Sequence, residues 1–428
     1  MEKILYPNNS KRDSMLARPL KESAELQLLC KQVFDNVRVQ GDEALRSYTA
    51  QFDKVDIAQF KVQHSEYDYA ETQVNDELKA AIALAYDNIR AFHQTQIPQV
   101  CEWENGYGVR CWQEARAIEK VGFYIPGGSA PLFSTILMLA IPAKLAGCEE
   151  IVICSPPDRN GNINPAMLWA ARYCGVTDFY KIGGVQAIAA MALGSESINK
   201  VYKIFGPGNQ YVTAAKQYAT NYGVAIDMPA GPSEVMIIAD ETAKPEFVAA
   251  DLLSQAEHGG DSQVILLTWT PVILPEIEKQ LQKQLLALPR KNIAIEALAN
   301  SKFIVLNNAD MAIDWANYYA PEHLIICTNN YQAIAEKITN AGSVFLGNFS
   351  PESAGDYASG TNHTLPTNGF AKAYSGVNID SFIKKITFQE LSRQGLGRLA
   401  STIMLMADTE QLYAHKNAVQ IRIKTTEE

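Results

Sequence analysis

A carboxylate and an imidazole stand side by side at Glu322 and His323, directly before the apolar run Leu324–Cys327. That run predicts a short buried strand, so we expect the pair near a strand end, where α/β enzymes place their chemistry. A neighbouring acid and base can move protons to and from a substrate near neutral pH. An isolated Glu-His pair is more often structural than catalytic, so a catalytic role for this pair depends on other segments rich in His, Asp and Gln.

Four further residues are candidate metal ligands. Gln255 and His258 are three positions apart, after a helix start predicted at Pro245, so we expect both on one helix face. Asp356 and His415 come from two later segments and would supply an oxygen and a nitrogen ligand. Spacing does not show that the four converge, and ordinary hydrogen-bonded polar groups remain the alternative.

Three Gly/Pro turns follow expected strands and precede expected helices: Pro126–Ser129, Gly183-Gly184 and Gly206–Asn209. Glycine lets the backbone approach a ligand closely, and a helix N-terminus favours an anion such as a pyrophosphate. None of the turns matches the G-x-G-x-x-G dinucleotide fingerprint. A single turn of this kind is more often a purely structural tight turn. The three together make a nucleotide or phosphate site as well supported as a purely structural role.

Short apolar segments alternate with helical stretches across the middle of the chain. This alternation is typical of βαβ units with mostly parallel strands, and the number of strands favours two sheets. We expect mainly helix in the first 120 residues, and helix again after about residue 378, including Phe388–Leu391. The expected strands are Val121–Ile125, Ile151–Cys154, Phe179–Ile182, Val201–Phe205, Val235–Ala239, Val264–Thr268, Phe303–Leu306, Leu324–Thr328 and Ser343–Leu346.

The composition of the whole chain narrows the class of protein. The 428 residues are 47% hydrophobic and 20% charged, which is ordinary for a globular protein with a large core. A formal net charge of -10 argues against nucleic acid or an anionic membrane as the main partner. No run reaches the length of a membrane span. The seven Cys include no C-x-x-C pair, which fits reduced thiols in the cytoplasm.

Taken together, the segments closely resemble the histidinol dehydrogenase family, from about residue 17 to about residue 423. The motifs that carry the resemblance are long and rich in unusual residues, so a chance match is negligible. They are Val121–Pro131, Gly206–Asn209, Ile226–Glu234, Asp251–Gly259, Pro321–Leu324, Ser350–His363 and Ala414–Ala418.

The resemblance implies oxidation of L-histidinol through L-histidinal to L-histidine, the last steps of histidine biosynthesis, with two NAD and one zinc per site. Carried over by position, it implies roles for the following residues. The zinc ligands would be Gln255, His258, Asp356 and His415, and the acid/base pair would be Glu322 and His323. The substrate would contact these six residues and also Ser233, His363 and Glu410, and NAD would contact Tyr124, Gln186 and Asn209.

The resemblance also implies an architecture. It predicts an α/β fold with two Rossmann-like parallel-sheet domains that lack the usual fingerprint, a helical N-terminal segment and a helical C-terminal tail. We expect an N-terminal arm (1–20), a first α/β domain with the zinc and acid/base residues (21–120 and 235–377) and a second with the NAD site (121–234). The tail (378–428) would be exchanged in a homodimer, so that His415 and Glu410 serve the partner's site.

The chemistry of the reaction assigns roles to the pair. Converting an alcohol to an acid needs two hydride transfers with a hydration between them, and the protein must manage the protons. A histidine suits proton transfer with the substrate oxygen, so we assign this role to His323. A carboxylate with a raised pKa suits activation of water, so we assign this role to Glu322. Zinc would position the imidazole and amino nitrogens of the substrate.

Other functions could use the same residues. A thiol mechanism through Cys148, Cys154 or Cys174 is disfavoured, because neither Cys148 nor Cys154 has a neighbouring group that would lower its pKa, and buried structural thiols are the better interpretation. A relative acting on another small polar alcohol is the nearest rival. A zinc hydrolase could use the same ligands but would leave the glycine turns unexplained, and a non-catalytic scaffold would leave the acid/base pair unexplained.

Overall fold

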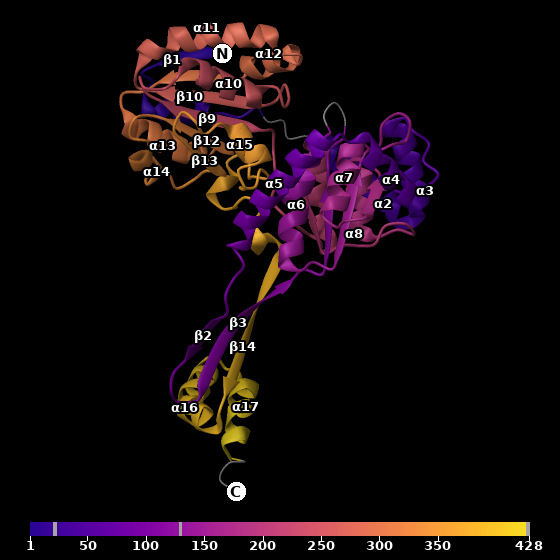
Figure 1. Ribbon diagram of the computed structural model, residues 1–428. Coiled ribbons are helices and arrows are strands. Elements are labelled where there is room, and N and C mark those ends of the chain that lie inside the picture. Colours follow the sequence, from indigo (N-terminus) through magenta and orange to yellow (C-terminus); the bar gives the residue numbers. More distant parts are fainter. Residues whose placement is uncertain (20–23, 128–130, 425–428) are drawn as a thin grey trace. The chain divides into compact units, whose positions relative to one another are not determined.

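The computed structural model describes residues 1–19, 24–127 and 131–424 of the chain. These residues form two compact units, each of which combines segments that are far apart in the sequence (Figure 1). The first unit comprises Met1–Gln96 and Ile118–Ser381, and the second comprises Ile97–Ala117 and Phe382–Glu428.

The first unit contains two sheets whose strands all run parallel, one six-stranded and one five-stranded. The six-stranded sheet has the order β1 (Glu2–Leu5), β11 (Lys302–Val305), β10 (Gln263–Thr268), β9 (Glu234–Ala239), β12 (His323–Cys327) and β13 (Ser343–Leu346). The five-stranded sheet has the order β6 (Asp178–Lys181), β5 (Glu150–Ser155), β4 (Lys120–Tyr124), β7 (Lys203–Phe205) and β8 (Ala225–Ile226). The expected α/β fold with two parallel sheets is confirmed, and all nine expected strands are present.

Helices cover both faces of each sheet, so the strands between them are apolar at nearly every position rather than at alternate positions. The helices of this unit are α1 (Arg12–Met15), α2 (Ala24–Gln40), α3 (Asp42–Tyr48), α4 (His64–Gln73), α5 (Asp76–Gln94), α6 (Phe133–Ala146), α7 (Pro165–Tyr173), α8 (Gly184–Leu193), α9 (Gln210–Ala219), α10 (Pro245–Ala256), α11 (Leu274–Ala287), α12 (Lys291–Ala299), α13 (Ala309–Tyr319), α14 (Tyr331–Ala335) and α15 (Glu352–Tyr357). On the six-stranded sheet, α10, α11 and α12 pack on one face and α13 and α14 on the other (Figure 1).

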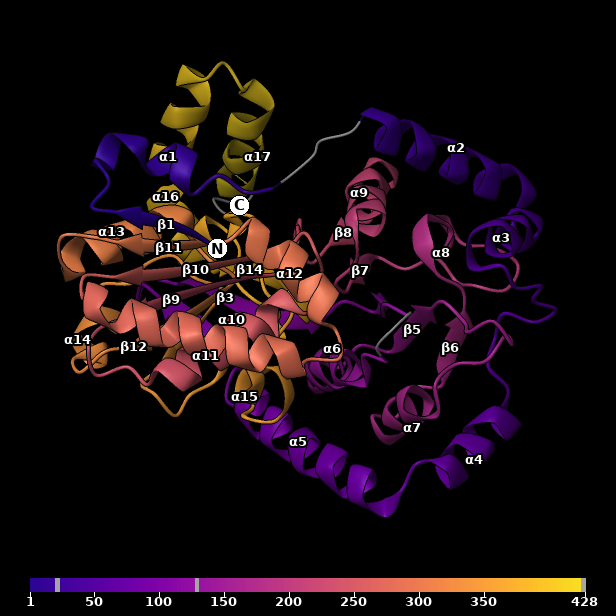
Figure 2. The same cartoon turned by 90° about the horizontal axis from the view of Figure 1, so that it is seen from above.

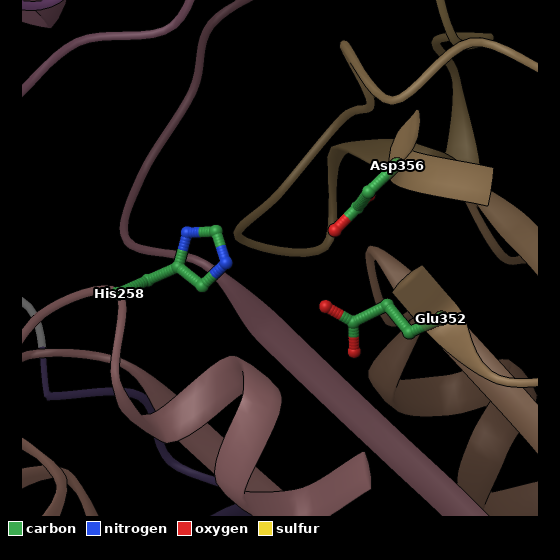
Figure 3. A group of neighbouring side chains, drawn as sticks. All are labelled: His258, Glu352 and Asp356. Atoms are coloured by element: carbon green, nitrogen blue, oxygen red, sulfur yellow. The ribbon is translucent and has the colours of Figure 1, made fainter. Parts of the chain in front are cut away.

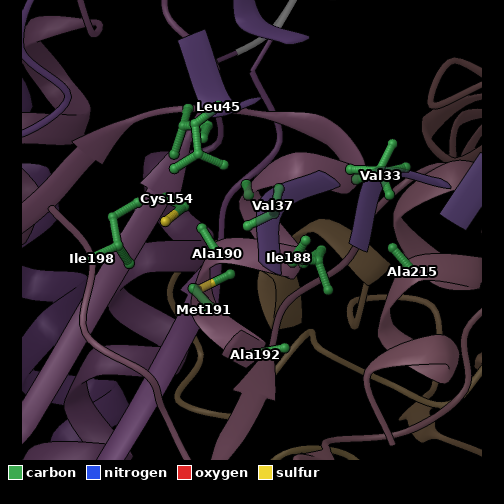
Figure 4. Packing of buried hydrophobic residues seen from close by; sticks show 14 of the residues in the cluster. Val33, Val37, Leu45, Cys154, Ile188, Ala190, Met191, Ala192, Ile198 and Ala215 are labelled. Atoms are coloured by element: carbon green, nitrogen blue, oxygen red, sulfur yellow. The ribbon is translucent and has the colours of Figure 1, made fainter. Parts of the chain in front are cut away.

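On the five-stranded sheet, α2, α3, α8 and α9 lie on one face and α6 and α7 on the other (Figure 2). Val33 and Val37 of α2 pack with Ile188 of α8 and Ala215 of α9, because apolar residues of α2 recur at helical spacing (Figure 4). This packing differs from the expectation that residues 21–120 join the domain of the acid/base pair. The other domain ranges stay a prediction.

The second unit is an antiparallel sheet followed by two helices. The sheet has the order β14 (Ile383–Leu391), β3 (Val109–Ala117) and β2 (Cys101–Glu104), and the helices are α16 (Arg393–Thr409) and α17 (Tyr413–Lys424). The expected helix through Phe388–Leu391 is therefore wrong. This strand is mostly exposed on both faces and so lacks the alternating pattern of a half-buried strand; its pairing with β3 includes a Trp112–Phe388 ring stack at 5.2 Å.

No helix within the described ranges is long and apolar enough to cross a membrane.

Candidate active site

The acid/base pair lies at the amino end of a strand. His323 is the first residue of β12, Glu322 precedes it, and Glu234 opens the neighbouring strand β9. Parallel α/β sheets more often place ligands at the carboxyl ends of their strands. Here the helix α10 ends near Gln255 at the edge where the strands begin, since a helix between parallel strands runs back to the amino edge.

Glu322 is held by two hydrogen bonds in a buried position. The backbone N–H of Glu234 donates to its Oε2 at 2.8 Å, and the Nε2 of Gln255 donates to the same oxygen at 3.3 Å. Burial raises the pKa of Glu322 to about 7. A carboxyl group with this pKa can exchange protons with a substrate or with water near neutral pH.

His323 is buried with its two ring nitrogens in different surroundings. The Nδ1 atom lies 3.2 Å from the carbonyl oxygen of Glu234, which assigns the proton to Nδ1. The Nε2 atom has no hydrogen-bond partner in the described chain and lies 3.7 Å from Oδ1 of Asp356. Burial lowers the pKa of His323, but the carboxylates of Glu352, Glu322 and Asp356 raise it more, to about 10.

Three side chains beside this pair present their ligand atoms to one another. Atoms of His258, Glu352 and Asp356 all lie within 4.8 Å of each other and point toward a common centre (Figure 3). His258 and Asp356 were expected as metal ligands, and Glu352 was not. Glu352 and Asp356 are four residues apart in α15, so this spacing was the signal that could have found it.

The polar atoms of this group fit a bound cation. The Oε1 of Gln255 and both carboxylate oxygens of Glu352 are buried without a hydrogen-bond partner in the described chain. Burial raises the pKa of Glu352 well above its usual value. Buried polar atoms are rarely left without partners, and the negative end of the α10 dipole adds to the attraction for a cation. The helix ends at Ala256, so His258 lies in the turn after it rather than on the helix face.

The remaining expected substrate contacts lie in three places. The Nδ1 of His363 bonds to the backbone oxygen of Asp356 at 2.9 Å, and its Nε2 lies 3.1 Å from the hydroxyl of Thr135 on α6. Ser233 directly precedes β9. Glu410, at the end of α16, and His415, in α17, belong to the second unit and are exposed there.

The expected cofactor residues cluster at the carboxyl ends of the five-stranded sheet. Tyr124 ends β4, and its hydroxyl accepts from the backbone N–H of Gly184 at 3.3 Å. Gln186, in the first turn of α8, donates to Asp53 at 3.4 Å. A cavity of about 840 Å³ beside them is lined by Asp53, Gly127 and Pro156 among other residues. In the turn Pro126–Ser129, the last two residues lie outside the described ranges.

The turn Gly206–Asn209 is fixed by a buried ion pair. The Nζ of Lys216 lies 2.5 Å from Asp227 and donates to the carbonyl oxygen of Gly206 at 2.8 Å. Asp227 in turn accepts from the backbone N–H of Gly206 at 2.8 Å. Asn209 caps α9 by accepting from the N–H groups of Tyr211 and Val212. The turn is thus held rigid at a helix N-terminus, a geometry suited to an anion.

The cysteines do not resemble nucleophiles. Cys148, Cys154 and Cys174 are buried, and burial raises the pKa of the Cys148 and Cys174 thiols to about 12 and that of Cys154 further. A nucleophilic cysteine needs a lowered pKa and access to substrate. The geometry therefore supports buried structural thiols.

The fold and the site define an α/β enzyme with a buried acid/base pair beside a group of side chains suited to a metal ion. A family model described as histidinol dehydrogenase matches residues 16–423, and the chain belongs to this family of oxidoreductases.

Named relatives agree with this membership. The histidinol dehydrogenase of Bacteroides thetaiotaomicron is 56% identical over 425 residues, covering 99% of both chains. That of Escherichia coli (strain K12) is 51% identical over 97% of this chain and 95% of its own. The crystal structure of histidinol dehydrogenase from Elizabethkingia anophelis superimposes with a TM-score of 0.98 at 55% identity, covering 100% of this chain and 99% of that one.

Proposed function

We propose that the protein oxidises L-histidinol through L-histidinal to L-histidine, the last steps of histidine biosynthesis, with two NAD and one zinc per site. One observation carries the proposal beyond family membership. Glu322 and His323 are held by the backbone of a single residue, Glu234, directly beside the candidate ligands His258 and Asp356. An acid/base pair and a cation site are thus adjacent, which suits two oxidations of a substrate held through its nitrogen atoms.

Zinc would be held by Gln255, His258 and Asp356 of one chain together with His415 of the partner subunit. Bound zinc would supply a positive charge that orients the substrate nitrogens, and bound NAD would accept the hydride of each oxidation. The unpartnered Oε1 of Gln255 supports its place among the ligands. Glu352 is a further candidate ligand from the same chain, because its two unpartnered oxygens face the group.

The site residues would divide the proton transfers between them. His323 removes the hydroxyl proton in the first oxidation, through the Nε2 that its Nδ1 contact leaves available. A base must be neutral, whereas the carboxylates around His323 raise its pKa to about 10. Engaging Asp356 with a cation would return the imidazole toward its neutral form. Glu322 removes a proton from the water that attacks the aldehyde, a task suited to its pKa of about 7.

NAD would bind at the carboxyl ends of the five-stranded sheet, in contact with Tyr124, Gln186 and Asn209. The two helix N-termini of α8 and α9 support a pyrophosphate there. The bond between Asn362 and the backbone of Met138 on α6, at 2.6 Å, ties this sheet to the segment of His363. This link supports a substrate contact at His363 that lies next to the sheet proposed to bind NAD.

The proposed assembly is a homodimer with shared sites, located in the cytoplasm. Ser233 and His363, with Glu410 of the partner subunit, would complete the substrate contacts. The seven cysteines include no C-x-x-C pair, which supports a reducing compartment.

The test is to supply zinc-loaded protein with L-histidinol and NAD and to count NADH formed per histidinol consumed. We expect a ratio near two with histidine as product. If NADH forms only with a different small polar alcohol, that alcohol is the substrate. Turnover of an amide or ester without NAD would favour a zinc hydrolase instead.

A further inference from the structure

An arginine near the start of the chain is bound to the residue that holds the acid/base pair. Arg18 donates from Nε to one carboxylate oxygen of Glu234 at 2.5 Å and from Nη2 to the other at 3.0 Å. The same Nη2 donates to the backbone oxygen of Tyr319 at 2.8 Å, and the guanidinium lies 3.8 Å above the Tyr319 ring. The carboxylate of Glu234 is buried, so the charge of Arg18 is its counter-ion.

Further buried polar groups surround Glu234 and Arg18 and link them to one another by hydrogen bonds. The Oε1 of Glu234 also accepts from the backbone N–H of Asn368 at 3.0 Å. The hydroxyl of Tyr319 donates to Oε1 of Gln263 at 2.8 Å, and the Nε2 of Gln263 donates back to the carbonyl oxygen of Ala17 at 3.1 Å. The N-terminal segment is therefore attached to the amino edge of the six-stranded sheet at both Ala17 and Arg18.

The backbone of Glu234 makes the two contacts that orient the pair. Its N–H donates to Glu322 at 2.8 Å, and its carbonyl oxygen lies 3.2 Å from Nδ1 of His323. A small shift of this one residue would move the carboxylate of Glu322. It would also break the contact that keeps the proton of His323 on Nδ1. Misplacement of a reacting group by about 1 Å can cost a hundredfold in rate.

We propose that Arg18 and Glu234 are positioning residues, which hold the peptide of Glu234 in place and so align Glu322 and His323. This inference rests on the proposed oxidation of L-histidinol. It assigns a task in the site to a segment of the chain that supplies no candidate metal, substrate or cofactor contact.

The chain offers a matched control for the test. Arg12 donates to Asp314 at 2.6 Å and lies 3.7 Å above the ring of Tyr318, on the same helix α13, but its carboxylate partner is exposed and contacts neither catalytic residue. Arg12→Met removes a similar pairing of carboxylate and ring without touching Glu234.

The experiment compares the steady-state constants and zinc content of Arg18→Met, Arg18→Lys and Arg12→Met with those of the wild type. We expect Arg18→Met to lower kcat by roughly 10- to 100-fold. Both KM values should stay within about twofold and zinc content should be unchanged. Arg18→Lys should recover only part of kcat, because an ammonium cannot form the two parallel bonds of a guanidinium. Arg12→Met should keep kcat within about twofold.

Loss of kcat no greater in Arg18→Met than in Arg12→Met would overturn the positioning role, and so would a change confined to KM. If Arg18→Met does not fold, Glu234→Gln, which keeps the shape and backbone of Glu234 but removes the ion pair, should lower kcat with KM unchanged; a normal kcat would overturn the role. Wild-type protein that fails to reduce NAD with L-histidinol would instead refute the proposed function itself.

Discussion

His258 is the exposed member of the group formed with Glu352 and Asp356, and it reaches the other two from the turn after α10. Imidazole nitrogen and carboxylate oxygen are both atoms that zinc binds in proteins. Its place beside the two carboxylates supports metal binding as its proposed role.

Replacing this imidazole should remove the metal and leave the fold intact. We predict that His258→Ala lowers zinc affinity by at least about 100-fold. Mutating a residue that only orients a ligand already lowers metal affinity by up to about 100-fold, and losing a ligand should lower it at least as much. Zinc content after dialysis would measure the loss of metal, and circular dichroism would measure whether the fold is kept. The exposed His64 of α4 provides the control as His64→Ala, which should keep its zinc. A zinc-replete and active His258→Ala would show that His258 is no ligand.

Residue types and spacing identified much of this site in advance, but not all of it. The structure brings together five of the predicted residues: Gln255, His258, Glu322, His323 and Asp356. They could be predicted because each stands in a distinctive segment of the sequence. Glu352 and Arg18 were missed. Arg18 was missed because its partner Glu234 lies 216 positions away, a pairing that a single sequence does not display. Glu352 was missed although its spacing to Asp356 is visible in the sequence, because the burial of its unpartnered oxygens is not.

At the scale of elements, the two sheets use opposite edges. The candidate cofactor turns follow β4, β6 and β7 at their carboxyl ends, whereas the acid/base pair precedes β12 at its amino end. The strands were predictable because burial on both faces makes them continuous apolar runs. The strand β14 was not, because it is largely exposed and pairs with a strand far away in the sequence.

The helix α10 also carries a buried acid whose ionisation should affect stability. Burial raises the pKa of Asp251 from an ordinary 3.8 to about 7. The folded protein thus holds this proton more tightly than the unfolded chain, so the resulting stability is fully present below about pH 3.8 and is lost as the pH rises through about 7.

Asp251→Asn resembles the protonated form and should raise the free energy of unfolding at pH 8 by up to about 4 kcal/mol, with little change at pH 4. Denaturant unfolding at both pH values would measure this difference. Asp87→Asn, at an exposed position of α5, serves as the control for loss of a helical carboxyl group. An equal effect of Asp251→Asn at the two pH values would contradict the account.

At the scale of the whole molecule, the second unit carries the expected partner contacts on a surface rich in exposed apolar side chains. The helix α17 buries none of its residues in the single chain. Exposed apolar side chains of this unit are Ile97, Val100, Trp103, Tyr107, Ile386, Leu405, Met406, Leu412, Tyr413 and Ile421. Such a surface is typical of a region that contacts another protein, here proposed to be a second copy of the chain.

A shared site can be tested by mixing two inactive variants. We predict that His323→Ala and His415→Ala are each inactive alone and that their co-expression restores about a quarter of wild-type activity, because half of randomly paired dimers would hold one intact site. Activity of the whole co-expressed preparation would be measured against each parent. A mixture as inactive as its parents would place His415 in the site of its own chain.

The most direct test of the central claim is to measure the two oxidations separately in Glu322→Gln. The amide oxygen can still accept from the N–H of Glu234, so the geometry is kept while the base is lost. NADH formation would be followed with L-histidinol and with L-histidinal. We predict that oxidation of the aldehyde slows by roughly a hundred- to ten-thousand-fold while oxidation of the alcohol changes far less, and that NADH per histidinol falls from two toward one. Equal loss in both oxidations would contradict the assignment of Glu322 to the activation of water.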